Sequence, residues 1–213
     1  MKQVIKRSLR IIRYLLSNHA QERYLESPPV YTTNAATGPK IHLGAGRINL
    51  QGWINIDALN LSHIHIIDSG LLLDEFVDGS ISVCYLCHVL EHFSVPEGEE
   101  LLKRIYNKLD SNGEVLISVP NFDVLVDKYI AEDRDLASIV QALSGGQDYD
   151  YNIHKSFYTY NALSQLIAKV GFRYIKQWGT IEEFGLDIND WSNKYIVVAG
   201  EKKPISINLK AIK

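Results

Sequence analysis

Residues 41–57 constrain the fold of this chain more than any other stretch, and they read IHLGAGRINLQGWINID. One short apolar run ends in Gly44, Ala45 and Gly46, and a second apolar run ends in Asp57. Glycines after a strand let a ligand approach the main chain closely, and a carboxylate ending the next strand can accept hydrogen bonds from a ribose diol. The stretch therefore predicts a pocket for an adenosine-like molecule at the carboxyl ends of parallel strands.

The spacing within this stretch disfavours a dinucleotide site. The dinucleotide fingerprint requires G-x-G-x-x-G and an acidic residue about 20 positions later. Here Asn49 occupies the third glycine position, and Asp57 follows Gly46 by only eleven positions. This interval is too short for a strand, a crossover helix and another strand, so a nicotinamide-dependent oxidoreductase is the least favoured alternative.

Three motifs in order resemble those of class I S-adenosyl-L-methionine (SAM)-dependent methyltransferases, in particular a small bacterial branch similar to methyltransferase type 11. Residues 43–57 match L-G-x-G-x-x-x-x-x-G-W-x-N-x-D, residues 88–93 match H-V-L-E-H-F, and residues 119–121 match V-P-N. The resemblance implies an α/β chain with a Rossmann-like, three-layer α/β/α sandwich. Its sheet would be seven-stranded and mostly parallel with an antiparallel last strand, and its cofactor would be SAM.

The resemblance also implies which residues hold the cofactor. Main-chain groups of residues 44–46 would line the methionine part, Asp57 would hold the ribose hydroxyls, and Asp68 with Ser69 would lie beside adenine. The expected cofactor-binding set is Leu43, Gly44, Ala45, Gly46, Asp57, Ala58, Asp68, Ser69 and His88.

Histidines near the predicted pocket are candidates for a general base. Methyl transfer to an oxygen often needs a base, and a neutral histidine suits that role near pH 7. The candidate catalytic residues are His92, His154 and His88, together with Asn121, which follows the fifth strand and would orient the acceptor.

The same region also spells H-x-x-E-H through His88, Glu91 and His92, which is the motif of inverted zinc proteases. A zinc site of that kind requires the three side chains on one helix face. The motif instead straddles a strand end and a turn, and Pro96 soon follows. We therefore expect no metal ion, and we expect Glu91 and His92 to line or brace the pocket.

Strand and helix patterns alternate from Lys40 onward, which is typical of an α/β domain with a parallel sheet. Strands are predicted at 40–43, 53–57, 64–67, 80–86 and 114–119, and helices near 71–76, 97–109 and from Thr159 to Val170. The last strands, at 172–178 and 194–200, are expected to form an antiparallel hairpin that closes the sheet.

Three segments are predicted within the chain: residues 1–37 as a basic amphipathic helix and linker, residues 38–203 as the cofactor-binding domain, and residues 204–213 as a tail. An insertion at about 122–157 begins with a helix over roughly 122–143 and would cover the binding face as a substrate lid. Its surroundings are rich in tyrosine, which suits sugar or aromatic acceptors: Tyr149, Tyr151, Tyr158 and Tyr160.

Residues 2–17 combine basic side chains with apolar residues at helical spacing. A helix that packs on the domain or closes over its pocket is the favoured interpretation, and peripheral contact with an anionic membrane surface is the alternative. A net charge of −3 gives no basic field for nucleic acid. Only two cysteines, Cys84 and Cys87, are present, which fits a reducing, cytoplasmic compartment.

Together these features predict a SAM-dependent methyltransferase that acts on a small-molecule or saccharide acceptor, at an oxygen, by in-line displacement. A module that binds SAM without transferring its methyl group is the main alternative.

Overall fold

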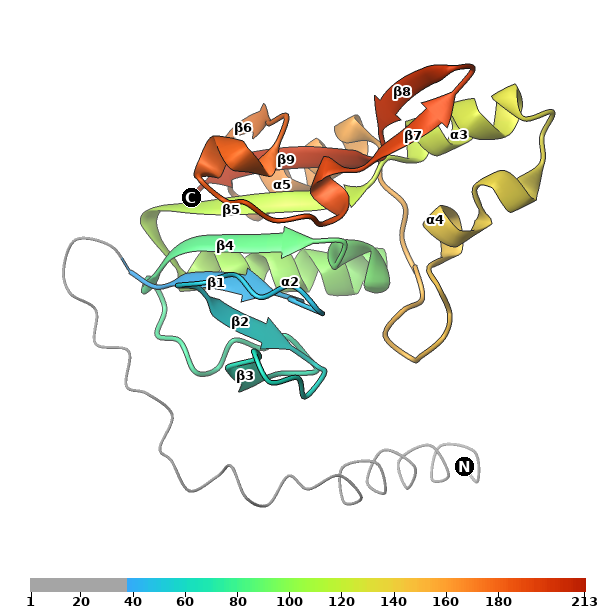
Figure 1. Cartoon of the computed structure of the whole chain (residues 1–213). Helices are drawn as coiled ribbons and strands as arrows, with labels where there is room; N and C mark the ends of the chain where they lie inside the picture. Colours follow the sequence, from blue (N-terminus) through green and yellow to red (C-terminus); the bar gives the residue numbers. More distant parts are fainter. Residues whose placement is uncertain (1–37) are drawn as a thin grey trace, which may run out of the picture. The chain divides into compact units, whose positions relative to one another are not determined.

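The computed structural model describes residues 38–213 (Figure 1). The expectations for residues 1–37, including the helix at 2–17 and its membrane contact, lie outside the described residues. None of the helices within residues 38–213 has the length and apolar character needed to cross a membrane.

A seven-stranded sheet forms the centre of the domain, with strand order β3-β2-β1-β4-β5-β9-β6. Its strands are β1 (Lys40–Leu43), β2 (Ile54–Asp57), β3 (Ile66–Ile67), β4 (Ile81–Cys87), β5 (Leu109–Pro120), β6 (Arg173–Gln177) and β9 (Ser206–Ile212). Neighbours from β3 to β5 pair in parallel, whereas β9 runs antiparallel to both β5 and β6. This confirms the predicted Rossmann-like sheet with an antiparallel last strand.

Helices α2 (Val95–Lys108) and α5 (Tyr160–Val170) cover one face of the sheet and contact each other (Figure 1). A capping box begins α2, in which the main-chain N–H of Ser94 donates to the Glu97 carboxylate at 2.9 Å. The Thr159 hydroxyl accepts from the main chain of Ala162 at the start of α5, and Gly171 ends the helix at φ +119°. Both helices match the predicted ranges because their termini carry these local signals.

The opposite face of the sheet is covered, within residues 38–213, by loops and by the 3-10 helices η3 (Ile181–Phe184) and η4 (Trp191–Asn193). Trp178 and Tyr85 belong to the apolar cluster on this side. The Tyr85 hydroxyl donates to the buried carboxylate of Asp190 at 2.5 Å, which ties the segment before η4 to the middle of β4.

Two cysteines on β4 lie on opposite faces of the sheet, as their spacing predicts. Cys84 belongs to the main core and Cys87 packs against the smaller cluster on the other face. Both thiols are free, and burial raises the pKa of each thiol.

The predicted helix at 71–76 is wrong, because this connection is made of turns. Leu71 and Leu73 adopt φ of +49° and +59°, and both side chains are buried. The apolar residues of this segment therefore reach the core from irregular backbone rather than from one face of a helix.

The predicted C-terminal hairpin and tail are also wrong. Residues of the expected strand at 194–200 form β7 (Tyr195–Val198), which pairs with β8 (Glu201–Pro204) in a separate two-stranded sheet. Residues 206–212, expected within a tail, form β9, which lies between β5 and β6 in the sheet and buries most of its side chains. Strand pairing over the whole length of β9 outweighs the weak local signal of its sequence.

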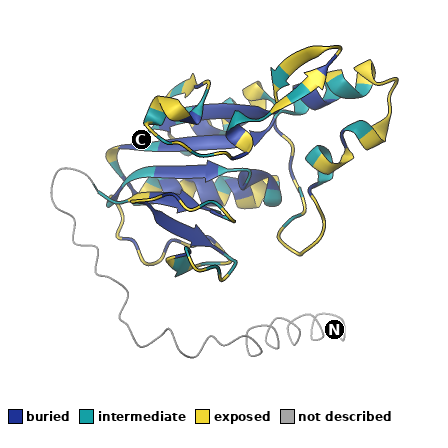
Figure 2. Cartoon of the chain, viewed as in Figure 1, coloured by how far each residue is buried: buried dark blue, intermediate teal, exposed yellow. Residues whose placement is uncertain are grey.

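The lid predicted at 122–157 leaves the sheet after β5 and is divided into several elements. They are α3 (Phe122–Ala131), η2 (Leu136–Ser138) and α4 (Val140–Ser144), so the single helix predicted over 122–143 is wrong. The helix breaks where Asp133 and Arg134 adopt φ of +52° and +64°. In Figure 1 the loop after α4 passes beside the carboxyl ends of the strands, and Figure 2 shows α3 and α4 more exposed than the sheet.

Candidate active site

The carboxyl ends of four neighbouring parallel strands bring the predicted site residues to one edge of the sheet. Gly44 follows β1, Asp57 ends β2, His88 follows β4 and Asn121 follows β5. Ligands of open α/β sheets bind at this edge. The structure thus assembles in space four residues that the sequence spreads over almost 80 positions.

Gly46 and Asp57 form what we call the cofactor pocket. The Asp57 carboxylate is 9% exposed and accepts hydrogen bonds from the main-chain N–H of Gly46 at 2.7 Å and of Leu59 at 2.8 Å. A carboxylate has about four lone-pair sites, so two acceptor positions remain for a diol. A Cβ on Gly46 would meet nothing within 4 Å. These residues fit an adenosine-type ligand.

Gly44 packs closely against a neighbouring turn, whereas Gly46 has open space beside it. A Cβ at Gly44 would lie 2.3 Å from Cγ2 of Val89, and the residue adopts φ +65°. The turn after β1 therefore packs directly against the turn after β4, and no larger residue fits between them.

The other expected cofactor residues near β1 and β2 are mostly covered. Leu43 and Ala45 are buried, and the Ala45 N–H donates to the Ile56 carbonyl at 3.0 Å, which fixes the glycine turn on β2. Ala58 is half-buried directly after Asp57. Their contacts with the cofactor stay predictions.

Asp68 lies beside Asp57, because its N–H donates to the Asp57 carbonyl at 2.9 Å. Its carboxylate accepts from the N–H groups of Gly70 at 3.1 Å and Leu73 at 3.0 Å, so it organises its own loop. Ser69 is exposed next to it. The proximity is compatible with the expected adenine contact of Asp68 and Ser69, which stays a prediction.

His63 also reaches the cofactor pocket, and sequence reasoning assigned it no role. Its Nε2 lies 2.9 Å from the carbonyl oxygen of Gly46. The contact joins the loop between β2 and β3 to the glycine turn. No local pattern in the sequence signals it, because it depends on how two loops pack.

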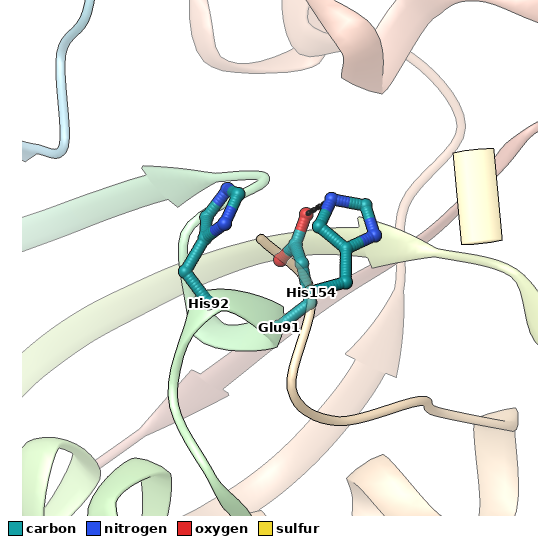
Figure 3. Close-up of side chains that lie close together, drawn as sticks. All are labelled: Glu91, His92 and His154. Carbon is teal, nitrogen blue, oxygen red and sulfur yellow. Dashed lines mark ion pairs between the residues drawn. The ribbon is translucent and has the colours of Figure 1, made fainter. Parts of the chain in front are cut away.

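A second group, which we call the histidine cluster, consists of Glu91, His92 and His154 (Figure 3). Glu91 and His92 belong to η1 (Leu90–His92) directly after β4, whereas His154 lies in the loop between α4 and α5. The Nε2 of His154 is 3.9 Å from Oε1 of Glu91, and the rings of His92 and His154 are 5.0 Å apart. The lid therefore supplies one of the three side chains.

Main-chain hydrogen bonds hold the lid segment on η1. The N–H groups of Lys155 and Ser156 donate to the Glu91 carbonyl at 2.7 and 3.2 Å. They fix the position of the preceding His154 relative to Glu91.

Burial determines the charge of the histidine cluster. Desolvation raises the pKa of the Glu91 carboxyl to about 8. It lowers the pKa of His154 to about 4 and also lowers that of His92, against hydrogen bonds to the main chain that act in the opposite direction. Both imidazoles are therefore neutral at pH 7.

His88, expected beside the cofactor and as a candidate base, lies at the back of this cluster. Its Nδ1 is 3.3 Å from Oε1 of Glu91, its Nε2 is 2.8 Å from the Ser206 hydroxyl, and its ring stacks on Trp191. Burial lowers its pKa to about 3. Both ring nitrogens thus face protein groups, which favours a positioning role over that of a base. Ser206 and Trp191 were missed because β9 and η4 were not predicted.

Asn121, the candidate for orienting the acceptor, is the N-cap of α3. Its side-chain oxygen accepts from the Val124 N–H at 3.4 Å. Its main chain also bridges to Tyr158 after the lid. The capping contact accounts for the residue locally, and a contact with the acceptor stays a prediction.

A pocket adjoins the histidine cluster under the lid, and we call it the acceptor pocket. It is lined by Glu91, Pro120, Phe122, Leu125, Ala142, His154, Ser156, Phe157 and Tyr158. The loop after α4 passes beside the carboxyl ends of the strands (Figure 1), and desolvation and then the charges of Asp57 and Asp148 raise the pKa of Tyr149 on this loop. The lid therefore lines the acceptor pocket and also comes close enough to Asp57 of the cofactor pocket for its charge to act on Tyr149.

The sheet order, the antiparallel β9 and the glycine turn facing an acidic residue define a Rossmann-like domain of the methyltransferase class. The chain belongs to the methyltransferase domain family, whose profile matches residues 44–177. No curated protein matches the chain significantly.

Solved structures share this fold at low sequence identity. A SAM-dependent methyltransferase from Archaeoglobus fulgidus is 17% identical, with 100% of this chain and 95% of that chain covered and a TM-score of 0.53. The 1,6-didemethyltoxoflavin-N1-methyltransferase of Burkholderia thailandensis, solved with 1,6-didemethyltoxoflavin and S-adenosylhomocysteine, is 15% identical, with 83% and 71% covered and a TM-score of 0.50. The chain spans only 35% of a longer Nostoc punctiforme protein, which matches 70% of it at 18% identity and a TM-score of 0.42.

Family membership and the shared fold support a SAM-dependent methyltransferase, with SAM as its cofactor. They agree with the class predicted from the three motifs. The nicotinamide-dependent alternative loses its remaining support, because the family and fold belong to methyl transfer.

Proposed function

We propose that the chain transfers a methyl group from SAM to an oxygen of a small-molecule acceptor, with saccharides as the leading class. The observation that supports this most is the arrangement of the two pockets. The cofactor pocket with Asp57 and the acceptor pocket with Glu91 and His154 both lie at the carboxyl edge of the parallel strands.

The residues of the cofactor pocket bind and orient the donor. When bound, SAM supplies a methyl group already activated by a positively charged sulfur. Asp57 would accept hydrogen bonds from the ribose hydroxyls while its bonds to the Gly46 and Leu59 N–H groups keep the carboxylate in place. Holding donor and acceptor in line can contribute about 7–11 kcal/mol to lowering the barrier.

The acceptor pocket combines apolar walls with a few polar groups. Phe122, Phe157 and Tyr158 provide ring surfaces, and the Ser156 hydroxyl donates to the Tyr158 hydroxyl at 3.1 Å. Such walls suit the apolar face of a sugar or another ring, while the polar groups bind hydroxyls. The pocket therefore supports an acceptor that carries both a ring and a hydroxyl group.

The histidine cluster lies where the acceptor must lose a proton. Transfer to a hydroxyl oxygen requires that its proton leave; His154 would accept this proton at Nε2, while SAM, when bound, would supply the methyl group and leave as S-adenosylhomocysteine. The neutral imidazole of His154 can accept a proton, and its Nε2 is 3.9 Å from the Glu91 carboxylate. An imidazole with a pKa near 4 is a weak base alone, so the ionised form of the Glu91 carboxyl, which becomes more populated as the pH approaches 8, would stabilise the imidazolium that forms.

We also propose a cytoplasmic location and small acceptors rather than nucleic acid. Two free cysteines, Cys84 buried and Cys87 partly buried, fit a reducing compartment, and the net charge of −3 provides no general attraction for phosphate backbones. Membrane contact through residues 2–17 remains the alternative to their packing on the domain.

Incubating the purified chain with methyl-labelled SAM and small-molecule extract tests this function. We expect S-adenosylhomocysteine to form together with a labelled product, which mass spectrometry identifies. The variant His154→Ala should lose most turnover, whereas His65→Ala, at an exposed position outside both pockets, should retain it. SAM binding without any S-adenosylhomocysteine formation would instead identify a binding module.

A further inference from the structure

The histidine cluster has the composition and spacing of a metal site. We propose that Glu91, His92 and His154 bind a divalent transition-metal ion of the zinc type. Each residue offers one ligand atom, and the three atoms lie within 4.8 Å of one another. Two imidazole nitrogens and one carboxylate oxygen suit zinc and neighbouring metals of the first transition row.

The Glu91 carboxylate is the strongest single argument for a cation. The residue is 1% exposed, and neither carboxylate oxygen has a partner with hydrogen-bond geometry, although Oε1 lies 3.3 Å from Nδ1 of His88. An isolated buried carboxylate costs several kcal/mol, and native proteins rarely leave buried polar atoms unpaired. A divalent ion would bind a carboxylate oxygen directly and so provide the partner that the buried group lacks.

The two histidines present suitable nitrogens. The Nδ1 of His92 lies 3.3 Å from the carbonyl oxygen of Ile153, which leaves its Nε2 as the ligand atom. His154 directs its Nε2 toward Glu91. Metal-binding histidines commonly donate their second ring N–H to a main-chain carbonyl, which fixes the tautomer and the ring orientation.

Binding an ion requires a modest contraction of the cluster. Zinc bonds of about 2.0–2.2 Å place tetrahedral ligands roughly 3.3 Å apart, so atoms now up to 4.8 Å apart must close by about 1.5 Å. His154 lies on the lid loop, where small side-chain and loop adjustments are less costly than in the sheet. Three protein ligands would leave a fourth position open.

A bound ion would adjoin the acceptor pocket, because Glu91 and His154 line that pocket. An acceptor hydroxyl on the ion would ionise more readily and release its proton to water. This role of the ion rests on the proposed function, whereas binding of the ion does not.

This ligand set differs from the one that the H-x-x-E-H spelling suggests. His88, the first residue of that motif, contacts Ser206 and Trp191 instead of joining the three ligand atoms. His154 from the lid takes its place. The sequence argument against a zinc-protease site therefore holds, but it does not apply to this cluster.

Titration of the chelator-treated full chain with Zn²⁺ by calorimetry, and with Co²⁺ by visible absorption, tests the proposal. We expect one ion per chain and the visible bands of a low-symmetry cobalt site. Glu91→Gln and His154→Ala should each weaken Zn²⁺ binding by at least about 100-fold, more than the loss of an outer partner. The matched control His65→Ala removes an exposed histidine and should bind like the unmodified chain.

The unmodified chain gives a result that does not depend on the folding of any variant. Absence of Zn²⁺ and Co²⁺ binding would overturn the proposal, as would equal binding by Glu91→Gln and the unmodified chain. SAM is titrated into the same samples. A chain that binds SAM but no metal refutes the site alone, whereas one that binds metal but no SAM refutes the proposed function and leaves the site intact.

Discussion

Removing the Asp57 carboxylate should strongly weaken cofactor binding. The carboxylate accepts two main-chain hydrogen bonds and retains acceptor positions for the ribose diol. A hydrogen bond to a charged group contributes about 1.5–3 kcal/mol, so losing two bonds to ribose amounts to roughly 3–6 kcal/mol. Since 1.4 kcal/mol is about tenfold in affinity, Asp57→Ala should raise the Kd for SAM by about 100-fold or more.

Two further variants make this measurement specific. Asp57→Asn keeps the size and one acceptor oxygen but places an amide group near main-chain N–H donors, so we expect an intermediate loss of about 10- to 100-fold. Asp74→Ala removes an exposed carboxylate from the segment before β4 and should leave the Kd unchanged. Calorimetry provides the Kd, and circular dichroism checks folding. A folded Asp57→Ala protein with an unchanged Kd would refute the assigned ribose contact.

Two other predictions concern stability. Gly44→Ala places a Cβ 2.3 Å from a Val89 methyl group and should lower the free energy of unfolding by about 2–4 kcal/mol. Gly46→Ala meets no atom within 4 Å and should lower it by only about 1–2 kcal/mol, because of its φ alone. Equal losses of stability for the two variants in thermal unfolding would contradict the packing argument. Burial raises the pKa of Glu91 to about 8 in the folded state, so between its unfolded pKa and pH 8 the folded chain retains a proton that the unfolded chain has lost. The Glu91 contribution to the free energy of unfolding of the metal-free protein should therefore fall from pH 6.5 to 8, by at most about 1.4 kcal/mol per pH unit. Because the lowered pKa values of His88, His92 and His154 act in the opposite direction near pH 6.5, the test is the difference in slope between the unmodified protein and Glu91→Gln; the same slope in both proteins would rule out a buried, protonated Glu91.

The cofactor pocket could be predicted because its signals are local. The glycine turn and Asp57 lie within one stretch of seventeen residues, and each ends or follows a strand that the apolar pattern marks. The hydrogen bond from Gly46 to Asp57 then follows from placing two parallel neighbours in register. Fold class and cofactor type are accordingly the parts that sequence reasoning obtains most directly.

The histidine cluster depends on contacts that the sequence does not display. His154 reaches Glu91 only because the lid returns across η1 and is held there by main-chain hydrogen bonds. The letters H-x-x-E-H direct attention to His88 instead, whose ring faces β9. The Glu91 carboxylate is buried without a hydrogen-bond partner only once the chain has folded, so the sequence alone cannot show this.

The position of β9 could not be predicted for a similar reason. Its residues follow Lys202, Lys203 and Pro204, which read as the end of the ordered domain. Pairing with β5 along seven registered positions, and with β6 on its other side, makes it an interior strand of the sheet. Long-range pairing of this kind outweighs local composition, and it also brings Ser206 to His88.

A crystal structure of the full chain with S-adenosylhomocysteine tests the central claim most directly. We expect both ribose hydroxyls within about 3.2 Å of the Asp57 carboxylate, the amino-acid part over the turn that contains Gly46, and the sulfur directed toward the acceptor pocket. A nucleoside bound at another edge of the sheet, or a ribose turned away from Asp57, would contradict the account.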